Sequence, residues 1–154
     1  MIRGFLCAVH RPRLVTGITT GIIPAAATTG MLLGYGLRLG AASRVFQAIG
    51  AVFLGPAGES ASRSPLATTV GIVLHVVATL ACGVAYVAFA GDSEDHRFAW
   101  AIAIGAAVSA IAFLAVRTVA GSIALVLTPG NLIAIGAVIA ITLPIGMRLA
   151  PTRL

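Results

Sequence analysis

The sequence contains no lysine and little charge of any kind. Its 154 residues include 10 basic residues, all of them arginine, and 4 acidic residues. Charged residues make up 9% of the chain and hydrophobic residues 59%, whereas soluble domains usually have about 25% charged residues. This balance excludes a water-soluble globular domain, because too little polar surface would keep it dissolved. It also excludes a soluble nucleic-acid-binding module with a basic, aromatic-rich face.

Cysteines and motifs of reactive residues are also scarce. Cys7 lies near the start of the chain and Cys82 inside an apolar run, so the two form neither a disulfide framework nor a metal-ligand spacing. The acidic patch at 92–96 is typical of a solvated turn before a helix, where acids are favourable. We therefore predict no metal site and no enzymatic activity, since no nucleophile and base form a recognisable arrangement.

The charged residues all lie outside four long uncharged runs, at 14–37, 66–90, 98–116 and 118–147. A helix needs about 20 apolar residues to cross a bilayer, so each run can span. The last run is too long for one untilted crossing, but Thr128 and Pro129 form a helix-start signature that favours a crossing at 131–147. Residues 118–127 then either continue the third helix past Arg117 or form an interfacial or re-entrant segment.

A shorter amphipathic segment separates the first two crossings. Around 41–54, Arg44 and Gln47 share one side while valine, isoleucine and phenylalanine fill the other, which is typical of a short helix lying in the membrane interface. Gly, Ser and Pro in 55–65 indicate a loop. The sequence thus predicts an all-α integral membrane protein, with four transmembrane helices in one small bundle. The short link at 91–97 predicts that the second and third crossings are antiparallel neighbours.

The arginines give a prediction of orientation. With four crossings, one side holds six of them and the other side four: Arg3, Arg11, Arg13, Arg97, Arg148 and Arg153 against Arg38, Arg44, Arg63 and Arg117. Basic residues collect on the cytoplasmic side, so we predict that both termini are cytoplasmic. We predict that the membrane is the bacterial inner membrane, and we interpret the absence of lysine as a GC-rich coding bias rather than as chemistry.

Small residues recur every four positions along the predicted helices. The first helix has two such lines: Gly17, Gly21 and Ala25 on one, and Ala26, Gly30 and Gly34 on the next. Small residues let membrane helices approach closely and gain dispersion contacts. Two adjacent lines exceed what one neighbouring helix would use, so we predict that Gly17, Gly21, Ala25, Gly30 and Gly34 include a surface for the helices of a partner.

His75 is the only side chain inside a crossing that can carry a charge near neutral pH, and such residues are functional candidates. One interpretation is a neutral imidazole hydrogen-bonded to a threonine of the first helix. The other is a ligand to bacteriochlorophyll or haem. Gly71 and His75, four residues apart, resemble the small-x-x-x-His arrangement of bacterial light-harvesting polypeptides, and this resemblance implies room for a macrocycle beside the histidine.

The scarcity of reactive residues and the small-residue lines favour a protein that acts by packing against other membrane helices rather than by catalysis. We predict a non-catalytic accessory subunit of a larger integral-membrane bioenergetic complex, photosynthetic or respiratory, whose partners are other membrane subunits and bound lipids. The alternative is a small channel or transporter. Against that alternative, the crossings contain no Asp, Glu, Lys or Arg, and intramembrane charges usually mark transport pathways.

Overall fold

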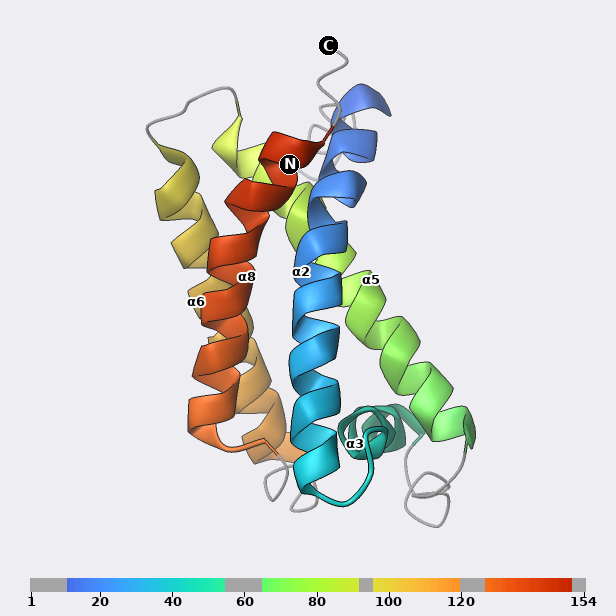
Figure 1. Cartoon of the computed structure of the whole chain (residues 1–154). Helices are drawn as coiled ribbons and strands as arrows, with labels where there is room; N and C mark the ends of the chain where they lie inside the picture. Colours follow the sequence, from blue (N-terminus) through green and yellow to red (C-terminus); the bar gives the residue numbers. More distant parts are fainter. Residues whose placement is uncertain (1–10, 55–64, 92–95, 120–126, 151–154) are drawn as a thin grey trace.

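The computed structural model describes residues 11–54, 65–91, 96–119 and 127–150 (Figure 1). In this part of the chain the regular structure is helical. The five helices are α2 (Arg11–Arg38), α3 (Arg44–Leu54), α5 (Pro65–Ala90), α6 (Arg97–Val119) and α8 (Pro129–Leu149). Residues 55–64 of the predicted loop and residues 120–126 lie outside the described part of the chain. Pro65, the last residue of that predicted loop, is instead the first residue of α5, and α6 continues past Arg117 to Val119.

Four of these helices are long enough and apolar enough to cross a membrane. The shortest of them, α8, has 21 residues, which at about 1.5 Å per residue span the roughly 30 Å hydrocarbon core. The prediction of an all-α membrane fold, with four crossings and a short helix between the first two, is confirmed. The chain is therefore a four-span integral membrane protein. The side of the membrane on which its termini lie stays a prediction.

The four long helices alternate in direction, so the bundle has two distinct ends (Figure 1). At the end that we call the Arg97 end, α2 begins, α5 ends, α6 begins and α8 ends. The opposite end, the Arg38 end, carries the end of α2, the whole of α3 and the starts of α5 and α8. Arginines lie within the last or first turn of α2, α6 and α8, because their long side chains can reach the interface from a helix end.

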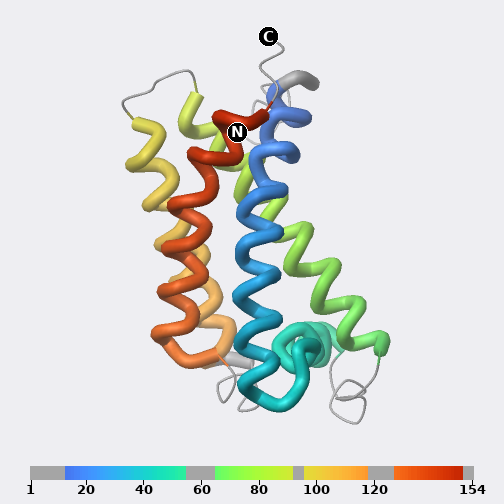
Figure 2. The backbone as a smooth tube through the Cα atoms, viewed as in Figure 1, coloured from blue at the N-terminus to red at the C-terminus, as the bar shows by residue number. Residues whose placement is uncertain are grey.

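Helix α2 is the centre of the bundle. It packs against α5 on one side and α8 on another, while α6 packs on α8 and α3 packs on α5 (Figure 2). The expected antiparallel pair of α5 and α6 differs from the structure, since these consecutive helices make few contacts. The glycines explain the difference: Gly83 of α5 faces α2, Gly71 of α5 faces α3, and Gly105 of α6 faces α8. Small-residue surfaces rather than the short link therefore select the neighbours.

The α2 and α5 backbones meet at a glycine crossing point. A methyl group added at Gly17 would come within 2.6 Å of Val84 Cα, and one added at Gly21 within 2.8 Å of Leu80 Cα. A methyl group at Gly83 would collide with the Gly17 carbonyl oxygen and the Gly21 backbone. Main-chain atoms therefore touch directly here, which is how membrane helices gain dispersion energy without a hydrophobic drive.

Glycines play the same part where α8 meets its two neighbours. Gly105 of α6 and Gly136 of α8 are in backbone contact, and the Ser109 hydroxyl donates across the same contact to the Leu132 carbonyl at 3.1 Å. On the other side of α8, Gly146 lies directly on the Thr20 carbonyl of α2. These contacts fix α8 between α6 and α2.

Pro24 explains why the Thr20 carbonyl faces Gly146. Proline has no N–H, so Pro24 cannot donate to the carbonyl four residues earlier, which is that of Thr20. The nearby Thr28 hydroxyl donates to the Pro24 carbonyl, at 2.7 Å. The Thr20 carbonyl meets the Gly146 backbone, whose Cα–H groups are weak donors.

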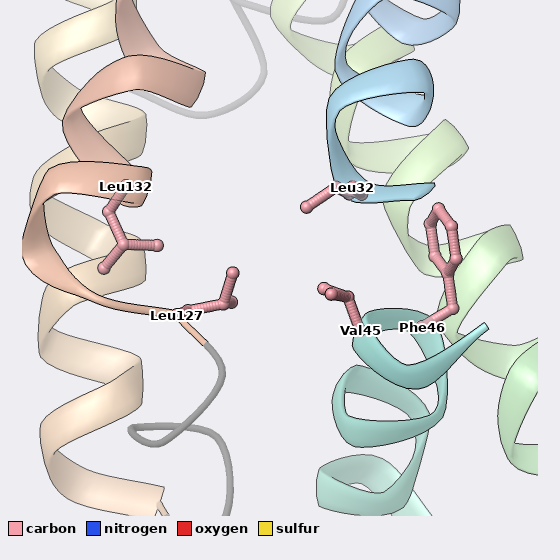
Figure 3. Packing of buried hydrophobic residues seen from close by; sticks show 5 residues of the cluster. All are labelled: Leu32, Val45, Phe46, Leu127 and Leu132. Carbon is pink, nitrogen blue, oxygen red and sulfur yellow. The ribbon is translucent and has the colours of Figure 1, made fainter. Parts of the chain in front are cut away.

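Helix α3 lies across the Arg38 end and buries one side. Val45, Phe46 and Gly50 are its buried residues, whereas Phe53 on the other side is 68% exposed. Figure 3 shows Val45 and Leu32 pointing toward Leu127 and Leu132, which lie around the start of α8 on the opposite side of the bundle. The predicted amphipathic pattern is present, but its apolar side packs on the protein's own helices.

Candidate functional site

His75 forms a contact point of three helices. Its Nε2 lies 3.0 Å from the Thr28 hydroxyl oxygen of α2, and its ring meets the Phe46 ring of α3 edge-on, with 5.8 Å between centroids. Because the Thr28 hydroxyl donates to the Pro24 carbonyl, its oxygen is left to accept from His75 Nε2–H. This arrangement places a proton on Nε2 of His75.

The predicted hydrogen bond between His75 and a threonine of the first helix is thus confirmed. Hydrogen bonds between membrane helices contribute only about 0.6 kcal/mol on average. Because this energy is small, the bond mainly orients the imidazole and links α2 to α5 at one position. The close packing of the two helices comes from the glycine contacts. His75 has a positioning role in this arrangement.

The space beside His75 that the macrocycle prediction requires is occupied by α3. The face of Gly71 that would hold a macrocycle is in contact with the Phe46 backbone, and a single methyl group there would collide with the Phe46 carbonyl oxygen. Nε2, the ring nitrogen farther from the backbone, is engaged by Thr28. Gly71 thus contacts α3 and His75 contacts α2.

The two small-residue lines of α2 have different surroundings. Gly17 and Gly21 contact α5, and Ala25 is buried at 8% exposure, so this line packs within the chain. Gly30 and Gly34 belong to the other line, and a methyl group added at either would meet no atom of the described structure within 4 Å.

The open line continues as a stripe of exposed residues along α2. Ile22 and Ile18, one and two turns before Ala26, are 54% and 39% exposed, and Ala26, Gly30 and Gly34 are exposed as well. We call Ala26, Gly30 and Gly34 the open notch of α2. In Figure 1 no other helix passes in front of α2. The notch is bordered by Leu33 and Leu37, which are 38% and 66% exposed.

A second polar group lies at the Arg97 end and has no local sequence signal. Tyr86 of α5 is fully buried and its hydroxyl has no hydrogen-bond partner in the described structure. The charges of Arg97 and Arg148 are near enough to act on this hydroxyl. Sequence reasoning missed the group because the three residues lie on three helices and are far apart in the chain.

Within the described ranges, no group of three or more His, Cys, Asp or Glu could hold a metal ion. The acids of the 92–96 patch fall at 92–95, outside those ranges, so the solvated turn stays a prediction. Comparison with protein families, curated proteins and solved structures finds no match for this chain.

Proposed function

We propose that this protein is a non-catalytic accessory subunit of a larger integral-membrane complex, and that the open notch of α2 receives a helix of its partner. The observation that carries the proposal is the contrast along one helix. Gly17 and Gly21 are filled by α5, whereas Gly30 and Gly34 have nothing within 4 Å in the described structure.

The chemistry of the notch suits a transmembrane helix. Ala26, Gly30 and Gly34 repeat every four residues, which is the small-x-x-x-small spacing that lets two helix backbones come into contact. Glycine inside a helix costs about 0.5 to 1 kcal/mol relative to alanine. Two glycines exposed to lipid would lower stability without any gain, whereas a partner helix would recover that energy as packing.

The partner that we propose is a subunit of a bioenergetic complex, photosynthetic or respiratory, in the bacterial inner membrane. Small accessory subunits are common in such assemblies, and their role is to fill space and hold lipid. The alternative, a small channel or transporter, predicts solute flux through the isolated protein. Flux measurements on liposomes that contain the purified chain distinguish the two.

Replacing Gly30 or Gly34 by leucine tests the docking proposal. Leucine would fill the notch, so we expect at least about a tenfold loss of co-purified partner in mild detergent, the equivalent of 1.4 kcal/mol. The chain itself should keep its thermal stability, because the new side chain meets no neighbour.

Ala106→Leu and Ala110→Leu are matched controls, since both positions are exposed on α6 and lie outside the notch. They should retain the partner. Unchanged co-purification after Gly30→Leu and Gly34→Leu would contradict docking through this surface.

A further inference from the structure

Three helix ends converge on Tyr86 at the Arg97 end. The residue is fully buried in a cluster from α5, α6 and α8, composed of Tyr86, Ala90, Ala101, Ile139 and Leu143. Buried hydroxyl groups in proteins nearly always have a hydrogen-bond partner, yet the Tyr86 hydroxyl has none in the part of the chain described. Among the described residues, this buried hydroxyl therefore lacks the partner that its burial calls for.

Two arginines flank this hydroxyl. Arg97 begins α6, and Arg148 lies in the last turn of α8. Their neighbours Ala101, one turn after Arg97, and Met147 both pack in or against the Tyr86 cluster, so the ends of α6 and α8 that carry the two arginines adjoin this cluster. Arg148 is exposed and Arg97 half-buried, so an anion from the headgroup layer would meet their guanidinium groups first, above the buried phenol.

An aromatic pair marks the depth of this end in the bilayer. Phe89 of α5 and Trp100 of α6 stack with 5.1 Å between ring centroids and 18° between ring planes. They are 46% and 38% exposed. Tryptophan is enriched at the membrane interface, and Trp100 lies three residues after Arg97, on the neighbouring turn of the same helix face. The arginines thus lie at the level of lipid phosphates.

We propose that Arg97, Arg148 and the Tyr86 hydroxyl bind the phosphate of an anionic phospholipid, with its acyl chains against Phe89 and Trp100. Guanidinium groups recognise phosphate through paired, charge-assisted hydrogen bonds, and the phenol supplies a further donor. The exposed aromatic rings beside the arginines suit acyl chains and would offer nothing to a free phosphate ion. The proposal does not depend on the open notch of α2, which lies on another part of the bundle.

The test compares lipids on the full chain purified in mild detergent. Phosphatidylglycerol, phosphatidylcholine or inorganic phosphate is added, and bound lipid is counted by native mass spectrometry while the thermal unfolding midpoint is recorded. We expect phosphatidylglycerol to be retained and to raise the midpoint, with little effect from the other two. Arg97→Gln with Arg148→Gln should weaken its binding at least about tenfold.

Tyr86→Phe provides a variant that keeps the buried ring and removes only the hydroxyl. Without lipid it should be at least as stable as the native chain, because the hydroxyl has no partner to lose and its burial carries a desolvation cost. With phosphatidylglycerol its midpoint should rise less than that of the native chain. This lipid-dependent difference separates a binding role from a structural one, and it stands even if the double arginine variant does not fold.

Arg38→Gln with Arg117→Gln removes the same charge from the opposite end and should retain phosphatidylglycerol. The proposal is overturned if this control loses as much lipid as the double variant, or if phosphatidylcholine binds equally well. An equal effect of inorganic phosphate would show a free-anion site and overturn the lipid assignment. An undiminished lipid response in Tyr86→Phe would remove the hydroxyl from the site.

Discussion

Replacing Gly83 by leucine is expected to lower the free energy of unfolding by about 3 kcal/mol or more, at the upper end for overpacked sites. A side chain at Gly83 would collide with the Gly17 carbonyl oxygen and the Gly21 backbone. Main-chain atoms of a helix cannot turn aside as a flexible side chain can, so α2 and α5 would have to separate. Because α2 also contacts α8, the whole bundle would loosen.

The thermal unfolding midpoint in mild detergent, together with the yield of monodisperse protein, measures this effect. Gly30→Leu is the matched control, because it makes the same substitution on α2 where nothing described lies within 4 Å. We expect it to unfold at the native temperature. A Gly83→Leu chain as stable as the native one, or an equal loss in both variants, would contradict the glycine crossing point.

Gly50→Leu should detach α3 from α5 and leave the four long helices in place. A side chain at Gly50 would collide with the Ala67 carbonyl oxygen, and the same helix pair meets again where Gly71 contacts the Phe46 backbone. Overpacking of this kind costs about 2 kcal/mol. Undocking would expose Phe46, which is now 1% exposed, and would leave His75 without its aromatic neighbour.

Limited trypsin cleavage at Arg44, in the first turn of α3, reports this undocking. A cost of about 2 kcal/mol should increase the population of the open form, and with it the cleavage rate, by at least about tenfold. Phe53→Ala alters the exposed side of α3 and should leave the rate unchanged. If Gly50→Leu is cleaved no faster than the native chain, α3 is not held by these backbone contacts.

The crossings and their ends were predictable because lipid imposes them on the sequence directly. A bilayer sets the length of an uncharged run, and arginines border those runs. The start of α8 was also readable: Thr128 caps the helix by accepting from Asn131 N, and Pro129 is its first residue. The hydrogen bond of His75 to a threonine was predicted because a lone polar group in lipid needs a partner nearby.

The choice of neighbours could not be predicted in the same way. Gly17 and Gly30 lie in similar local sequences, and only the path of α5 across α2 decides that the first is covered and the second open. The same holds for Tyr86, whose distance from Arg148 depends on how three helices meet. Gly71 is the opposite case, because its sequence pattern was misleading. Its four-residue separation from His75 suggested room for a cofactor, whereas in the structure α3 packs against Gly71.

Labelling of single cysteines with a membrane-impermeant maleimide tests the four-span arrangement most directly. In a chain with Cys7→Ser and Cys82→Ala, new cysteines replace Ser43 after α2, His96 before α6 and Gly130 at the start of α8, all described positions near helix ends. We predict that Ser43→Cys and Gly130→Cys are labelled from one side of the membrane and His96→Cys from the other. Labelling of all three from the same side would contradict four crossings.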